Sequence, residues 1–160
     1  MFAEVIRGRF RGEADGSADA AYALPNAARV GLAVLDQAHG ALLGRLNAAH
    51  RALAAKDQTA ARLQLEVLRS DMATHFDLEE QIMQALGFRA MRDHVRHHAA
   101  SAARFEDIFR KSLARGALLV EDLDHCFHAL IDEIMRGDVA LKTHFQSMSS
   151  RRPVQQQGVS

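Results

Sequence analysis

The sequence predicts an all-α protein, folded as an up-down-up-down bundle of four helices. Alanine, leucine and arginine are abundant, and the 160 residues include only two prolines. Apolar residues recur at helical spacing along four long segments. The breaks between these segments are short, and short connections favour neighbouring helices that run in opposite directions. The chain length suits one domain with a substantial core.

The first helix is expected to begin at Leu24-Pro25-Asn26, where proline marks a turn and a plausible helix start. It should run to about Ala55. Its apolar positions are Val34, Leu35, Ala38, Leu42, Leu46, Ala49 and Leu53.

A break at residues 56–58 separates the first two predicted helices, and Asp57 is the candidate N-cap of the second. The second helix should run to about Leu86, and Gly87 should end it. Its predicted inward residues are Leu63, Val67, Met72, Ile82 and Met83.

Two further helices follow. The third is predicted over about 89–114 and ends at Gly116, and the fourth over about 119–148. The bundle domain is therefore residues 27–148. Residues 1–26 are expected to form an irregular arm, and residues 149–160 a disordered tail.

Composition excludes several classes of function. Twenty basic and twenty acidic residues balance, so there is no electrostatic case for nucleic acid or an anionic membrane as a partner. The single cysteine, Cys126, has no partner for an internal disulfide. Apolar runs are shorter than the roughly 20 residues of a membrane span. We expect a cytoplasmic protein.

Nine histidines are unusual for a chain of this size, and several have the spacing of metal ligands. His75 and Glu79 are four residues apart, as are His94 and His98. On a helix, this spacing places both side chains on one face, one turn apart. These two pairs predict a metal site inside the bundle.

Counting residues from each predicted turn places the candidate ligands at one height. For each turn, one candidate ligand precedes it and another follows it, and their separations from the turn agree to within one residue. These pairs are His39 with His75, Glu79 with His94, and His98 with Glu133. Asp138 lies near the same layer, but its position is about 140° further around an α-helix than Glu133, so its geometric case is weaker.

Four imidazoles and three carboxylates are too many ligands for one ion, so the set predicts two ions bridged by carboxylates. Nitrogen and oxygen donors suit iron or manganese. Two other interpretations of Glu133 stay open: a group behind the ligands, or a solvated residue beside Asp132. His128 is a rival ligand, but it lies roughly 9 Å from the layer by helix rise.

Four motifs in this chain resemble those of the hemerythrin and bacteriohemerythrin-like family of non-haem diiron, dioxygen-binding four-helix bundles. The motifs are Asp36-Gln37-Ala38-His39 with Leu42 and Asn47; His75-Phe76-Asp77-Leu78-Glu79-Glu80 with Met83; Phe88 with His94 and His98; and Glu133-Ile134 with Gly137-Asp138. The resemblance covers about residues 30–145.

The resemblance implies a role for each ligand. His39 and His75 would bind the iron that keeps an open coordination position, and His94 and His98 would bind the other iron. Glu79 and Asp138 would bridge the two. The family normally has a fifth histidine at the position of Glu133.

Three functions follow as expectations. The first is a binding protein for dioxygen or another small diatomic ligand, used in sensing, delivery or storage. The second is a diiron enzyme that reduces oxygen, peroxide or nitric oxide, because a carboxylate at Glu133 should favour the ferric state. The third is a metal-poor structural or signalling bundle. We expect a binding protein rather than an enzyme.

Overall fold

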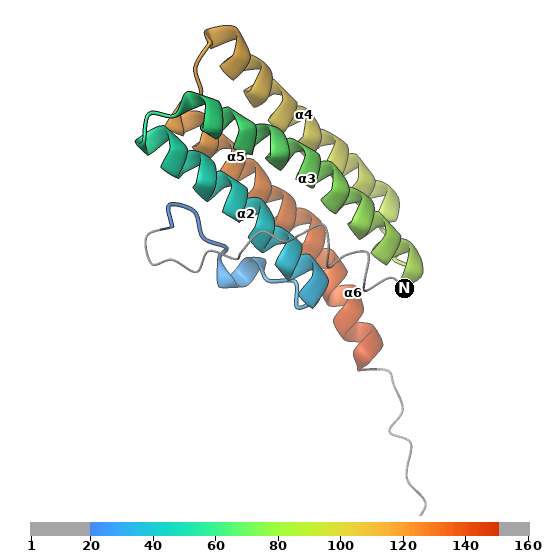
Figure 1. Ribbon diagram of the computed structural model, residues 1–160. Coiled ribbons are helices and arrows are strands. Elements are labelled where there is room, and N and C mark those ends of the chain that lie inside the picture. The colour runs from blue at the N-terminus through green and yellow to red at the C-terminus, as the bar shows by residue number, and fades with distance from the viewer. Residues whose placement is uncertain (1–19, 151–160) are drawn as a thin grey trace, which may run out of the picture.

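The computed structural model describes residues 20–150, and within this range the chain is helical and contains no strand (Figure 1). Four long helices form a bundle: α2 (Ala33–Ala54), α3 (Gln58–Ala85), α4 (Met91–Arg115) and α5 (Val120–Glu133). Helices α2 and α4 each pack against both α3 and α5. The predicted all-α class and the four-helix bundle are confirmed. Residues 1–19 of the predicted arm and 151–160 of the predicted tail lie outside the described residues.

The predicted turns between helices are confirmed, with the expected residues at their ends. The Asp57 carboxylate accepts a hydrogen bond from the backbone N–H of Ala60 at 2.9 Å, which caps α3. Gly87 follows α3 with φ +62°, and Gly116 ends α4 with φ +78°. Both angles lie in the left-handed region, which costs glycine little.

The predicted start of the first helix at Pro25-Asn26 is wrong. Only a short 3₁₀ turn, η1 (Asn26–Ala28), forms there, and α2 begins at Ala33. Gly31 adopts φ +83°, in the left-handed region that an α-helix does not use. The Asp36 carboxylate then accepts hydrogen bonds from the N–H groups of Val30 at 2.7 Å and Gly31 at 3.0 Å. These contacts stabilise a loop in place of the first predicted helical turns.

The predicted fourth helix is not continuous. After α5 the backbone forms a π-helical turn, η2 (Ile134–Asp138), and then continues as α6 (Val139–Ser149), which extends beyond the end of the bundle (Figure 1). A π turn inserts one extra residue into the helix, so the side chains that follow change direction. This change alters which residues of the last segment face the bundle interior.

The buried apolar residues form two clusters, one toward each end of the bundle. One contains Leu46, Leu68 and Leu130, and the other contains Leu35, Met83 and Leu141. The predicted inward position of Leu63 is wrong, because its side chain is 56% exposed. The buried stripe of α3 runs instead through Ala61, Leu65, Leu68 and Met72.

Candidate metal centre

Seven polar side chains are buried together between the two apolar clusters. They form two groups that share Glu79, and in each group one donor atom from every residue lies within 4.8 Å of the others. None of the seven is more than 5% exposed. The first group is His39, His75, Glu79 and Asp138, and the second is Glu79, His94, His98 and Glu133. The structure therefore brings together all seven residues that the sequence suggested as ligands.

Each element of the bundle supplies part of the set. Helix α2 carries His39, α3 carries His75 with Glu79 one turn later, and α4 carries His94 with His98 one turn later. Glu133 is the last residue of α5, and Asp138 is the last residue of η2. The two i, i+4 pairs point inward as helical spacing predicts.

Asp138 lies closer to the other candidate ligands than an ideal α-helix would place it. Its side chain is completely buried, and Oδ2 lies 3.0 Å from Nε2 of His39. In a π turn the hydrogen bonds join residues five apart, so Glu133 and Asp138 come to lie on the same side of the helix. The 140° separation expected from α-helical rotation is therefore wrong for this segment.

Gly137 allows this turn to approach the site closely. A Cβ atom at this position would lie 2.9 Å from Cε1 of His94 and 3.4 Å from Oε1 of Glu133. Ordinary carbon–carbon contacts are about 3.5–4.0 Å. The His94 ring therefore occupies space that any other residue at 137 would need.

Two carboxylates divide their oxygens between the two halves of the site. Oε1 of Glu79 lies 3.7 Å from Nε2 of His75, and Oε2 lies 2.9 Å from Nε2 of His98 and 3.3 Å from that of His94. Asp138 places Oδ2 beside His39 at 3.0 Å and Oδ1 3.7 Å from Nε2 of His94. Each of these carboxylates could therefore offer one oxygen to each half of the site.

The distances fit donors that share an ion. Two donors that each lie about 2.1 Å from one ion are roughly 3.0 Å apart at right angles and roughly 4.2 Å apart when opposite each other. The nitrogen–oxygen distances in the site range from 2.9 to 4.0 Å. Both ring nitrogens of His39 and His75, and both oxygens of Glu133 and Asp138, are buried without a hydrogen bond of good geometry among the described residues. Such buried polar atoms are costly unless they bind something.

The electrostatics of the protein chain by itself also favour a bound cation. Burial, with the negative charge of Glu79, raises the pKa of Glu133 to about 7. Burial, with the charges of Glu133 and Glu79, raises the pKa of Asp138 to about 8. Burial lowers the pKa of His75 to about 4, which leaves it neutral and able to bind a metal. A divalent cation would neutralise the carboxylates and relieve their mutual repulsion.

Contacts behind the ligands orient His98. Its Nδ1 lies 3.2 Å from Oε1 of Glu80, which accepts its hydrogen bond, so Nε2 faces the site. The ring of Phe76 stacks on the His98 ring with centroids 4.1 Å apart. Sequence reasoning gave Glu80 no role, although its position directly after Glu79 on α3 was a usable signal.

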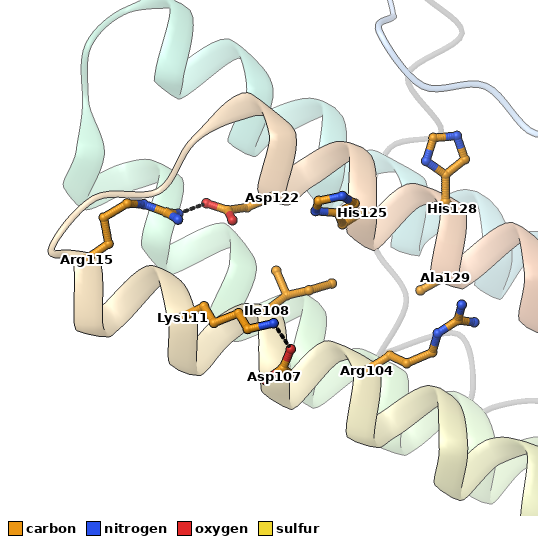
Figure 2. A pocket seen from close by; sticks show the side chains of 9 residues that line it. All are labelled: Arg104, Asp107, Ile108, Lys111, Arg115, Asp122, His125, His128 and Ala129. Atoms are coloured by element: carbon orange, nitrogen blue, oxygen red, sulfur yellow. Dashed lines mark hydrogen bonds and ion pairs between the residues drawn. The ribbon is translucent and has the colours of Figure 1, made fainter.

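The rival ligand His128 stays outside both groups, as its height predicted. It is exposed and, with His125, lines a surface groove of about 460 Å³ between α4 and α5 (Figure 2). The cations of this groove already have acidic partners: Lys111 pairs with Asp107, and Arg115 with Asp122. His50, also outside both groups, is half-buried, with its ring centroid 5.9 Å from that of Tyr22.

Comparison with models of known protein families, with curated proteins and with solved structures yields no match. The helices within residues 20–150 include none that is long and apolar enough to cross a membrane.

Proposed function

We propose that this chain is a hemerythrin-like, up-down-up-down four-helix bundle that holds two iron ions and binds dioxygen or another small diatomic ligand in the cytoplasm. The observation that carries the proposal is the enclosed set of four imidazoles and three carboxylates, with donor distances suited to two adjacent ions. Iron is proposed as the metal, and dioxygen as the ligand, because the four motifs resemble those of the hemerythrin family.

The donor chemistry supports iron over metals that prefer thiolate. All candidate ligands are nitrogen or oxygen donors, and the only cysteine, Cys126, is 1% exposed in the apolar core. Burial raises the pKa of its thiol to about 12, so it stays protonated. Iron and manganese both accept imidazole with carboxylate, so manganese is the competing metal.

The surroundings of the site favour a small ligand. In this proposal His39 and His75 hold one ion, His94 and His98 hold the other, and Glu79 and Asp138 bridge them. A ferrous pair bound there would supply the electrons that reduce bound dioxygen. The Phe76 ring, 8% exposed, and the apolar clusters on both sides of the site exclude water and larger molecules.

Iron quantification with absorption spectroscopy tests this function. Purified protein, loaded anaerobically with ferrous iron, should retain two ions per chain and show the near-ultraviolet charge-transfer bands of a diferric centre after exposure to air. Reversible spectral change under oxygen and vacuum would support oxygen binding. Protein that retains no iron after reconstitution would instead be a metal-poor structural or signalling bundle.

A second candidate is a diiron enzyme that reduces oxygen, peroxide or nitric oxide, and the buried carboxylate of Glu133 favours it. A third negative charge among the ligands stabilises ferric iron relative to ferrous iron. Glu133→His should therefore slow autoxidation. Two results together would contradict the enzyme hypothesis. They are equal autoxidation rates in the two proteins, and peroxide consumption that does not depend on residue 133.

A further inference from the structure

Glu133 lies between the two halves of the metal centre. Its Oε1 lies 3.5 Å from Nε2 of His98, and its Oε2 lies 3.9 Å from Nε2 of His75. Both distances fall within the range expected for two donors on one ion, roughly 3.0–4.2 Å. The side chain is completely buried, and neither oxygen has a hydrogen-bond partner among residues 20–150.

Glu79 divides its oxygens in the same way. Its Oε1 faces His75 at 3.7 Å, and its Oε2 faces His98 at 2.9 Å. Glu79 and Glu133 therefore connect the same two histidines, from different helices. Glu133 belongs to the second candidate group, and the approach of its Oε2 to His75 connects it to the first, as Glu79 is connected to both.

We infer that Glu133 is a third bridging carboxylate, bound to both ions, rather than a terminal ligand that replaces a histidine on one of them. The inference rests on the proposed dimetal centre and goes beyond it. A histidine at 133 could not take this role through Nε2, because a single ring nitrogen is directed at one ion. The substitution therefore changes the connectivity of the centre as well as its charge.

The inferred ligand set is symmetric. One ion receives His39 and His75, the other receives His94 and His98, and each receives one oxygen from every one of the three carboxylates. This gives five protein donors to each ion. A six-coordinate ion then keeps one exchangeable position. Exogenous ligand should therefore bind at both ions, whereas the family resemblance implies an open position on one iron only.

Metal affinity in variants that retain one ion tests the bridge. His39→Ala/His75→Ala removes the imidazoles of one position, and His94→Ala/His98→Ala removes those of the other. Glu133→Ala is then added to each background, and the affinity for Fe(II) and for Mn(II) is measured anaerobically by competition with a chelator. Glu121→Ala, an exposed glutamate in the first turn of α5, is the matched control.

A bridging Glu133 should lower the affinity at least about tenfold in both backgrounds, since losing a ligand weakens binding no less than losing a supporting contact. If Glu133 is a terminal ligand, its removal should lower the metal affinity in one background only. That result, or unchanged affinity in both backgrounds, would overturn the inference. Wild-type protein that binds fewer than two ions would instead overturn the proposed function.

A second measurement covers the case in which a double variant does not fold. Stepwise Mn(II) binding constants are compared between wild type and Glu133→Ala, whose four histidines are intact. Loss of a bridge should weaken both steps, whereas loss of a terminal ligand should weaken one and leave the other unchanged. Circular dichroism of each variant shows whether the helices persist.

Discussion

Gly137→Ala should damage the metal centre by steric conflict alone. The added Cβ would lie 2.9 Å from Cε1 of His94 and 3.4 Å from its Nδ1. Carbon atoms in contact are normally about 3.5–4.0 Å apart, so the ring or the η2 backbone must move by at least roughly 0.6 Å. The added methyl group carries no charge and binds no metal, so any loss of metal affinity must come from displacement.

The His94 ring has little room to move. It packs edge-on against the His98 ring at 4.4 Å and the Phe88 ring at 6.3 Å, and its Nε2 lies 3.3 Å from Glu79. Overpacking of this kind costs about 1–3 kcal/mol, whereas alanine in place of a helical glycine contributes up to about 1 kcal/mol. We expect a net loss of about 0–3 kcal/mol in stability. Displacing a ligand should lower metal affinity about 10–100-fold.

Gly40→Ala is the matched control. Gly40 is also helical, on α2 next to His39, but a Cβ there has nothing within 4 Å. It should stabilise the protein by up to about 1 kcal/mol and leave metal affinity unchanged. Urea unfolding with and without chelator, and a Mn(II) titration, measure both effects. If Gly137→Ala matched Gly40→Ala in both, the close approach of η2 to His94 would be refuted.

Three further predictions concern other contacts. In chelator-treated protein, burial raises the pKa values of Glu133 and Asp138 to about 7 and 8, above their unfolded values of about 4, so between these values the folded state binds more protons than the unfolded state. The free energy of unfolding should therefore fall as the pH rises from about 4 to about 8, whereas metal-loaded protein should lack this decline. Glu80→Gln removes the charge that orients His98, which should weaken Mn(II) binding about tenfold with little change in melting temperature, because Glu80 is 33% exposed. Lys56 adopts φ +60°, so Lys56→Gly should raise the free energy of unfolding by about 1 kcal/mol; an unchanged urea midpoint would contradict the strain at this turn.

The layer of candidate ligands could be predicted from the sequence because α-helical rise is regular. Turns at Asp57, Gly87 and Gly116 are marked by residues with strong local preferences, and residues counted from them reach the same height. His75 with Glu79, and His94 with His98, needed only helical spacing to share a face. This part of the prediction required no knowledge of packing.

The start of α2 could not be predicted in this way. Pro25 is a valid local signal for a helix start, but the Asp36 side chain binds the backbone of Val30 and Gly31 and stabilises a loop. Tyr22 shows the same limitation: its backbone exchanges two hydrogen bonds of 2.9 Å with the Asn47 side chain, and its hydroxyl donates to Asp124 at 2.7 Å. These partners are 25 and 102 residues away in the chain.

The sequence by itself determined the helical class, the turns and the height of the candidate ligands, because these depend on local propensity and on a constant rise per residue. Only the tertiary structure decided how the last segment faces the site. The π turn at Ile134–Asp138 aligns Asp138 with Glu133 and brings Gly137 against His94. An inserted residue of this kind leaves the apolar pattern almost unchanged. The contacts that η2 makes with His39 and His94 join it to other helices, and local spacing does not encode them.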